Sequence, residues 1–374
     1  MSKSILWKPT EERIKNSNAY DFIQFVNSKY GLELQTFDEL YDWSVNYFVN
    51  FWDLLLEYSG IKHEKHDPQA LLPKEKQFQG EHLLNYEWFP KTELNFAENL
   101  LRYKDDKTAL VYYPENKPPE KISYKELNEK VAKLAAAMKN SGIGEKDRVA
   151  GFINNGIEAV IAMLAASSLG AIWSSTSPDF GTRGVLDRFK QIKPKLLFAV
   201  DGYNYNGKEY DKKDVVDELA NEIPEIKKVI IIDKTAKAGE FANSRDKYII
   251  FDKFIDNKTK KIEFKQLNFN HPLYIMYSSG TTGLPKSIVH GQGGTLLQHY
   301  KELALHTDLS RDDVITYFTT TGWMMWNWLV SSLYIGSTIV LIDGSPALPD
   351  LGRLWKIIEN EKITVFGTSP KFLS

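Results

Sequence analysis

From about residue 106 onward, short apolar runs alternate with longer stretches in which apolar residues recur at helical spacing. The runs predict strands over residues 108–113, 147–153, 196–200, 229–232, 314–318, 338–342 and 364–366, and the helical spacing predicts helices over 122–141 and 157–169. Such alternation is typical of an α/β domain with layered, largely parallel sheets. In these folds, ligands bind beyond the carboxyl ends of the strands.

The first hundred residues show a different pattern, with large apolar residues at helical spacing over 20–30 and 37–58 and a further helical stretch over 88–101. We therefore expect a helical extension over residues 1–100 that precedes an α/β domain over residues 101–374. Within the domain, Ser123 and Glu126 have the spacing of a capping box that starts a helix, and Gly142 and Gly144 are expected to stop it.

A loop rich in Ser, Thr and Gly, residues 277–286, lies between two apolar runs, 273–276 and 287–290, and predicts a hairpin. Its backbone N–H groups and hydroxyls can turn towards one point, which suits phosphate oxygens. Gly280 and Gly283 permit close backbone approach, and Lys286 adds a mobile positive charge. The spacing is not that of a Walker A loop. The alternative is an ordinary Gly-rich turn, but turn chemistry alone does not explain two pairs of hydroxyl residues, two Gly, a Pro and a final Lys in one loop.

Composition excludes several classes of site and partner. The chain has 374 residues and a formal net charge of −2, which does not favour a nucleic-acid partner. It contains no Cys, so a disulfide, a thiolate metal site and a Cys nucleophile are excluded. His63 and His66 lie in a polar loop without further ligands, and we predict no metal site. No apolar run is long enough for a signal peptide or a membrane span, so we expect a cytosolic protein.

The stretch 277–286 resembles the phosphate loop of the adenylate-forming enzymes, which include acyl-CoA synthetases, peptide-synthetase adenylation domains and luciferases. The resemblance implies ATP with Mg²⁺, coenzyme A as co-substrate, and an acid that is first adenylated and then transferred to the thiol. It also implies that the ATP phosphates are bound by Ser278, Ser279, Gly280, Thr281, Thr282, Gly283 and Lys286, of which Thr281, Thr282 and Lys286 act in catalysis.

A second stretch, residues 319–328, follows a predicted strand and aligns with the acyl-pocket motif of the same family. The resemblance implies that Trp323, Met324 and Met325 line the pocket for the acid, whereas a Trp/Met core plug is the alternative. Its form departs from acetate-activating members and is similar to short-chain acyl-CoA synthetases that activate acetoacetate. The helical extension, residues 174–181 and residues 343–346 resemble the same group.

Two further positions are carried over from the resemblance. Lys208 falls where related enzymes hold the phosphates of coenzyme A, although a solvated loop Lys is an equal alternative. Gly170 falls in a structural motif and is expected to allow close packing of a helix on a strand.

The family motifs that normally follow residue 374 are absent, so we expect the chain to be a fragment that does not complete the reaction alone. Two alternatives stay open. The acid could be acetate, propionate or butyrate, or the chain could be a non-catalytic nucleotide-binding or scaffold protein.

Overall fold

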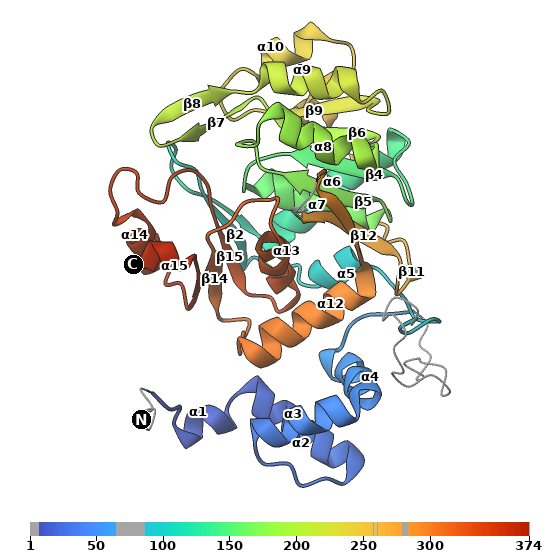
Figure 1. The fold of residues 1–374 in the computed structure, drawn as a ribbon, viewed down its shortest axis with the longest axis vertical. Coiled ribbons are helices and arrows are strands. Elements are labelled where there is room, and N and C mark those ends of the chain that lie inside the picture. The colour runs from blue at the N-terminus through green and yellow to red at the C-terminus, as the bar shows by residue number, and fades with distance from the viewer. Residues whose placement is uncertain (1–6, 65–86, 257, 260, 279–282, 374) are drawn as a thin grey trace.

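The computed structural model describes residues 7–64, 87–256, 258–259, 261–278 and 283–373. Two larger sheets form the α/β body, and a group of helices lies below them (Figure 1). The seven-stranded sheet has the order β10 (Tyr248–Ile250), β9 (Lys228–Ile232), β6 (Leu196–Val200), β4 (Arg148–Phe152), β5 (Ile172–Thr176), β12 (Pro272–Ser278) and β13 (Lys286–Gly291). The five-stranded sheet has the order β16 (Val365–Gly367), β14 (Val314–Tyr317), β15 (Thr338–Ile342), β2 (Thr108–Tyr113) and β3 (Glu120–Ser123).

Two small antiparallel pairs complete the strands: β1 (Glu93–Leu94) with β11 (Leu267–Asn268), and β7 (Gly202–Tyr205) with β8 (Lys208–Asp211). The helices are α1 (Glu11–Lys15), α2 (Asn18–Tyr30), α3 (Phe37–Asn46), α4 (Phe48–Ser59), α5 (Phe96–Leu100), α6 (Tyr124–Asn140), α7 (Ile157–Ser168), α8 (Thr182–Ile192), α9 (Lys213–Glu222), α10 (Ala238–Ser244), α11 (Phe251–Phe254), α12 (Gln292–Tyr300), α13 (Met324–Ser331), α14 (Arg353–Asn360) and α15 (Pro370–Leu373). A π-helical turn, η2 (Lys301–His306), and a 3₁₀ turn, η3 (Ser332–Tyr334), follow α12 and α13.

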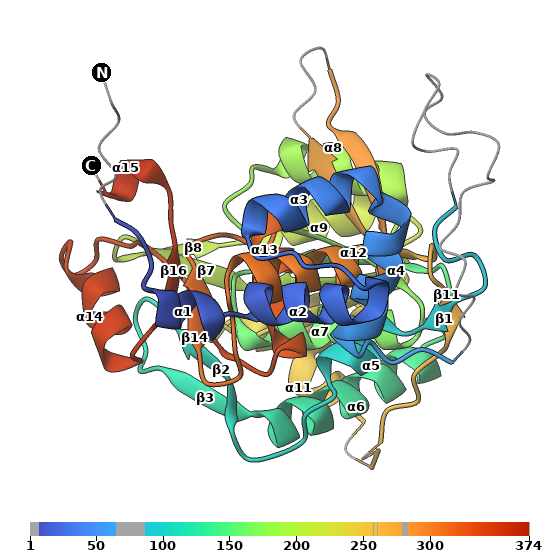
Figure 2. The same cartoon turned by 90° about the horizontal axis from the view of Figure 1, so that it is seen from below.

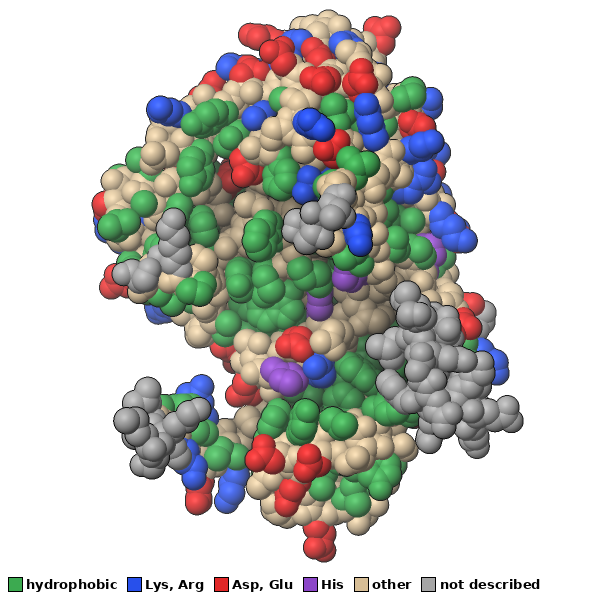
Figure 3. Space-filling view, viewed as in Figure 1, with side chains coloured by type: hydrophobic (Ala, Val, Ile, Leu, Met, Phe, Trp, Pro, Cys, Tyr) green, Lys and Arg blue, Asp and Glu red, His purple; other side chains and the backbone are tan. Residues whose placement is uncertain are grey.

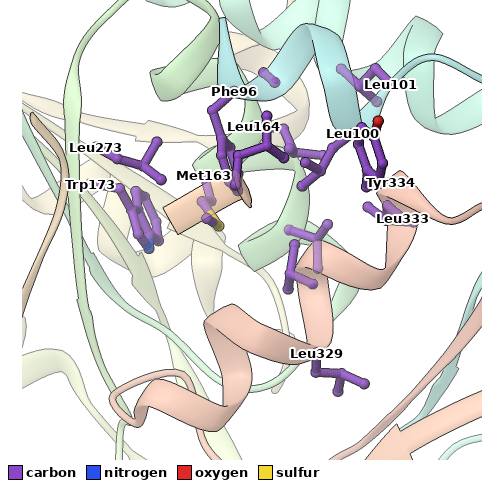
Figure 4. Close-up of a cluster of buried hydrophobic side chains, with 14 of the residues drawn as sticks. Phe96, Leu100, Leu101, Met163, Leu164, Trp173, Leu273, Leu329, Leu333 and Tyr334 are labelled. Carbon is purple, nitrogen blue, oxygen red and sulfur yellow. The ribbon is translucent and has the colours of Figure 1, made fainter. Parts of the chain in front are cut away.

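Most neighbouring strands in both sheets are parallel, as the alternating pattern predicts. The antiparallel exceptions are the edge pairs β12–β13 and β2–β3. Helix α7 is apolar around its whole circumference, and every residue of it except Glu158 is buried. The main core contains α7 together with residues of both sheets, such as Val149 and Ile339. Figure 4 shows part of this core, where Met163 and Leu164 of α7 lie near Phe96 and Leu100 of α5.

The predicted start of α6 is confirmed. The Ser123 hydroxyl accepts a hydrogen bond from the Glu126 N–H at 3.2 Å, and the Glu126 carboxylate accepts one from the Ser123 N–H at 2.7 Å. Strands β2, β6 and β15 have the predicted bounds. Capping and strand hydrophobicity both act within a few residues, which is why the sequence pattern is sufficient in these elements.

Two predictions in the helical extension are wrong. The helix predicted over residues 37–58 is broken at Tyr47, whose φ of −121° and ψ of 42° are not helical. The break lets α3 bury Leu40 and Trp43 while α4 buries its own apolar face. Residues 88–101 do not form one helix either, because β1 pairs with β11 before α5 begins.

Asn95, the N-cap of α5, is fully buried. Its side-chain Nδ2 donates to the backbone carbonyls of Ser167 and Ser168, each at 3.2 Å, and of Lys265 at 2.8 Å. The first two carbonyls belong to the C-terminal end of α7, where helical carbonyls have no intrahelical partner. Asn95 therefore joins the segment before α5 to the central helix of the α/β body.

The N-terminal helices form a layer below α12 (Figures 1 and 2). The side-chain amide of Asn18, at the start of α2, donates to the carbonyls of Ala304 and Leu309 at 3.1 and 3.2 Å. The hydroxyl of Tyr334 in η3 donates to the carbonyl of Ser59 at 2.6 Å. The core cluster that contains α7 also contains Phe22 and Leu55, so apolar packing continues from the extension into the body. Among the described helices, none has both the length and the apolar character that crossing a membrane requires.

Candidate functional site

The predicted hairpin is confirmed: β12 and β13 are antiparallel, with Ser278 opposite Lys286 and Tyr277 opposite Ser287. Gly283 has a φ of +144°, a conformation that glycine adopts readily and other residues rarely do. Four residues assigned to phosphate binding lie outside the described residues: Ser279, Gly280, Thr281 and Thr282. The assignment of these four residues stays a prediction.

The hairpin presents two faces, because successive side chains of a strand point to opposite sides. Ile275 and Tyr277 pack in the core cluster that contains Val185 and Phe189 of α8. Tyr274 and Met276 instead belong to the cluster that contains residues of α13. Ser278 follows Met276 by two residues and is paired with Lys286, so both residues belong to the α13 face of the hairpin.

The predicted acyl-pocket stretch begins α13 and divides into buried and exposed positions. Trp326 is 0% exposed, and its indole Nε1 donates to Oδ1 of Asn155 at 3.0 Å. Trp323, the N-cap residue, is 66% exposed, Met324 is exposed, and Met325 is half-buried. Trp326 is therefore a buried core residue, as the alternative interpretation of this stretch has it. Trp323, Met324 and Met325 lie at the N-terminal end of α13, which reaches the surface.

A polar residue that the sequence pattern did not single out connects the hairpin with α13. Asn327 is 1% exposed, and its Nδ2 lies 3.2 Å from Sδ of Met276 and 3.4 Å from the carbonyl oxygen of Trp323. The Ser278 and Lys286 face of the hairpin thus lies beside the start of α13. Figure 3 shows hydrophobic side chains gathered on the side of the molecule where α13 and the hairpin lie.

Hydrogen bonds between strand ends fix the segment that precedes Trp323. The Thr321 hydroxyl donates to the carbonyl of Ile153, just after β4, at 2.8 Å. The Ser175 hydroxyl of β5 donates to the carbonyl of Thr321 at 2.7 Å. Thr321 and Ser175 are buried, and buried hydroxyls are stable only when such bonds are made. The carboxyl ends of β4 and β5 in one sheet are therefore joined to the segment after β14 in the other.

A polar cavity of about 90 Å³ lies at the same ends of the strands. Among its lining residues, Lys234 forms an ion pair with Glu158 at 2.8 Å, and Asp343 accepts hydrogen bonds from Asn154 at 2.6 Å and from Tyr112 at 3.2 Å. Burial raises the pKa of Asp343. Burial alone would lower the pKa of Lys234, but the Glu158 carboxylate raises it above its ordinary value.

Lys234 and Glu158 are paired with each other and Asp343 is held by hydrogen bonds, so the cavity walls join the ends of β2, β4, β9 and β15. No role was predicted from the sequence for Lys234, Glu158 or Asn154. For Lys234 and Asn154 the available signal was their position directly after a predicted strand, where α/β folds gather polar groups, whereas Glu158 lies in the predicted helix over 157–169.

Lys208 is the first residue of β8 and is exposed, so it is solvated as the alternative to the coenzyme A contact has it, although it begins a strand and does not lie in a loop. Asn206 and Gly207 have φ of +53° and +75°, as a two-residue hairpin turn of the primed type requires. The Glu115 carboxylate accepts hydrogen bonds from both of their N–H groups, at 2.9 and 2.8 Å. Contact between Lys208 and coenzyme A stays a prediction.

The described part of the hairpin offers a hydroxyl and an ammonium group, which suit phosphate oxygens better than a metal ion. Throughout the described ranges, no group of three or more His, Asp or Glu side chains is placed to hold a metal.

Residues 96–374 match the family model described as AMP-binding enzyme. The chain is 44% identical over 382 residues to an acetoacetyl-CoA synthetase of Danio rerio, and the match covers 100% of this chain and 56% of that protein. It is 41% identical over 369 residues to an acetoacetyl-coenzyme A synthetase of Rhizobium meliloti (strain 1021), and this match covers 98% of this chain and 55% of that protein.

Among solved structures, the acetoacetyl-CoA synthetase from Streptomyces lividans superposes with a TM-score of 0.92 at 38% identity, covering 99% of this chain and 56% of that one. The chain thus spans about half the length of the curated relatives that it matches.

Proposed function

The chain belongs to the AMP-binding enzyme family, and on this premise we propose that it serves the AMP-forming ligation of acetoacetate to coenzyme A. In this reaction the acetoacetate carboxylate attacks the α-phosphorus of ATP, and pyrophosphate leaves. The acyl group of the resulting adenylate then passes to the thiol of coenzyme A, giving acetoacetyl-CoA and AMP. The similarity to acetoacetyl-CoA synthetases over the whole chain supports this choice of acid.

The observation that carries the proposal is that Ser278 and Lys286 belong to the face of the hairpin that adjoins α13. Attack of a carboxylate on a polyphosphate brings two anions together, so the reaction requires positive charge and oriented donors. The Lys286 ammonium supplies charge and the Ser278 hydroxyl supplies a donor. In this proposal Gly280, Gly283, Ser279, Thr281 and Thr282 complete the phosphate site, with Thr281, Thr282 and Lys286 in the catalytic role.

We assign the acid to the surface end of α13, formed by Trp323, Met324 and Met325. Large apolar side chains beside a charged reaction centre exclude water, which strengthens the electrostatic interactions there. The buried Trp326–Asn155 hydrogen bond and the Thr321 hydrogen bonds hold this end of the helix in place. A pocket built on a fixed helix start can distinguish acids by size and shape.

The co-substrates follow from the same reaction. ATP would bind with Mg²⁺, which would neutralise part of the phosphate charge, and coenzyme A is the acyl acceptor. Lys208 is the described candidate for contact with the coenzyme A phosphates. The partners in this proposal are small molecules, without nucleic acid or membrane. A cytosolic location, where ATP and coenzyme A are available, is part of the same proposal.

The proposal is tested by measuring pyrophosphate release with acetoacetate, acetate, propionate and butyrate, using the native protein purified from its source with its intact mass recorded. We expect release that depends on acetoacetate and exceeds that with the other acids by tenfold or more, roughly the discrimination that one or two methyl-sized contacts give. Equal release with acetate would identify a different short-chain ligase. ATP binding without any acid-dependent release would identify a non-catalytic nucleotide-binding protein.

A further inference from the structure

A glutamine on α8 contacts the backbone segment that carries Lys286. Nε2 of Gln191 donates to the carbonyl of Pro285 at 2.9 Å, and Oε1 of Gln191 accepts from the Ser287 hydroxyl at 3.0 Å. Pro285 and Ser287 are the two neighbours of Lys286 in the chain. One amide side chain thus holds the residues on both sides of the lysine, and it uses its donor on one and its acceptor on the other.

Helix α8 is itself firmly placed against the hairpin. Nε2 of Gln191 also donates to the carbonyl of Asp187, one turn earlier in the helix, at 2.6 Å. The Arg188 guanidinium lies over the rings of Phe180 and Tyr277, at 4.8 and 5.6 Å from the ring centroids. The Tyr277 hydroxyl donates to the Arg188 carbonyl at 3.4 Å. The amide of Gln191 is exposed to solvent, but it extends from a helix that these contacts hold against the hairpin.

The contact determines which way Lys286 points. Strand β13 is the edge strand of its sheet, so beyond its pairing with β12 nothing in the sheet holds its outer side. The Ser287 side chain points to α8, and Lys286, the preceding residue, therefore points to the opposite face, beside Ser278. Rotation of the 285–287 backbone would turn Lys286 away from that face, and the bonds to Gln191 oppose this rotation.

We propose that Gln191 is a positioning residue that holds Lys286 towards the phosphates of ATP. The inference rests on the proposed function, because it takes the Lys286 ammonium as the group that meets the β- and γ-phosphates. Gln191 acts through Lys286 and does not itself touch the nucleotide. The Lys286 side chain has many rotamers, so fixing its backbone reduces the ordering that ATP binding requires.

The test is calorimetric titration of the purified chain and its Q191A variant with MgATP and, separately, with AMP, which lacks the β- and γ-phosphates. We expect Q191A to weaken MgATP binding about three- to tenfold, the worth of one or two hydrogen bonds, and to leave AMP binding unchanged. In the K286A background, Q191A should have no further effect on MgATP binding, because the positioned group is gone. The matched control is Q298A, an exposed glutamine on α12 that bonds to Glu302.

Trypsin cleavage at the Lys286–Ser287 bond gives a second readout that needs no nucleotide. Q191A should be cleaved faster there than the wild-type chain and the Q298A variant. Faster cleavage with unchanged MgATP affinity would show a purely structural contact and overturn the inference while leaving the proposed function in place. Equal loss of MgATP and AMP binding, or an additive loss in Q191A/K286A, would also overturn it. A wild-type chain that does not bind MgATP would overturn the proposed function and the inference with it.

Discussion

The indole Nε1 of Trp326 donates to Oδ1 of Asn155 at 3.0 Å, and through this bond α13 is attached to the segment that follows β4. Asn155 in turn donates through Nδ2 to the carbonyl of Ile342, at the end of β15, at 3.2 Å. One buried asparagine therefore joins both sheets to the helix that begins at the candidate acid pocket. The exposed Trp323 and the buried Trp326 are consequently expected to respond differently to substitution.

Substitution of the buried tryptophan is expected to reduce stability. Trp326→Phe keeps most of the ring but leaves Oδ1 of Asn155 without its donor in a buried site, which costs about 1–3 kcal/mol of unfolding free energy. The measurement is urea unfolding followed by circular dichroism. Trp323→Phe is the matched control and should change the unfolding free energy by less than about 0.5 kcal/mol, because Trp323 is exposed. Equal losses for the two variants would contradict the assignment.

Substitution of the exposed tryptophan is expected to change selection of the acid. Trp323→Ala should raise the KM for acetoacetate about tenfold or more while the KM for ATP changes less than twofold, since removal of a packed aromatic surface weakens apolar contact. Steady-state pyrophosphate release by the native protein gives both constants. Trp355→Ala, which removes a tryptophan that is 51% exposed on α14, is the control and should leave both unchanged. A rise in the KM for ATP without a rise in the KM for acetoacetate would contradict the assignment of Trp323 to the acid pocket.

Removal of the Lys286 ammonium is expected to weaken nucleotide binding. Lys286→Ala should lower MgATP affinity roughly 10- to 100-fold, because hydrogen bonds to charged groups contribute about 1.5–3 kcal/mol. Calorimetric titration measures the effect. Lys356→Ala on α14 removes an exposed lysine that pairs with Asp350, and this control should bind MgATP as the wild type does. Added salt should weaken wild-type binding more than K286A binding, since a charge–charge contribution is screened.

Stability is expected to fall in acid partly through His299. Nδ1 of His299 lies 2.7 Å from the Ser331 hydroxyl, and burial, aided by nearby His290, lowers its pKa from 6.5 to about 4, while Glu302 opposes the shift. A lowered pKa means that the unfolded chain binds the proton first. The contribution is therefore fully present above about pH 6.5 and is lost as the pH falls towards 4, by about 3 kcal/mol.

The variant His299→Gln cannot titrate, and its amide can still bond to Ser331. Between pH 7 and pH 4 the wild type should therefore lose about 3 kcal/mol more unfolding free energy than H299Q, while carboxylates that titrate in both proteins cancel. Urea unfolding at a series of pH values gives the two curves. Curves that stay parallel over this range would show that His299 already carries its proton in the folded protein.

Gly170 is expected to tolerate no side chain. Its φ is +75°, and a Cβ built there would lie 2.6 Å from Cδ1 of Leu267. Gly170→Ala should therefore cost about 1–3 kcal/mol through backbone strain and overpacking. Gly142→Ala is the matched control, because its φ of +77° gives the same backbone strain while its Cβ would meet nothing within 4 Å. Thermal unfolding compares the two variants, and equal melting temperatures would contradict the close packing.

Elements whose signals lie within a few residues could be predicted from the sequence. The Ser123–Glu126 capping box and the apolar run of β15 act locally, and the structure has both. The break at Tyr47 could not be predicted, because large apolar residues continue at helical spacing on both sides of it. The sequence pattern shows only which residues are apolar. The break at Tyr47 depends on how α3 and α4 pack against the rest of the protein, which the pattern does not show.

In the candidate site, too, the local elements could be predicted from the sequence and the contacts between distant residues could not. The hairpin that carries Lys286 is formed by neighbouring residues, and its strands follow from their apolar character. Gln191, Asn327 and Asn155 come from other parts of the chain, and a polar side chain alone does not show which distant residue it contacts. Only the fold brings Gln191 beside Pro285, or Asn327 beside Met276.

The buried amide of Asn95 sets a condition on recombination between relatives. Its three carbonyl partners belong to the α/β body, so a chimera that took this asparagine from one parent and α7 from another would depend on both parents sharing the contact. A mismatched pair would remove the side-chain donor from the Lys265 carbonyl, at about 1–3 kcal/mol, whereas the Ser167 and Ser168 carbonyls would keep the backbone N–H groups of Gly170 and Lys265. Crossover points placed before Glu93 would keep Asn95 with its carbonyls, and the exchanged helices would then have to match the body only at their own contacts, such as Asn18 with Ala304 and Ser59 with Tyr334.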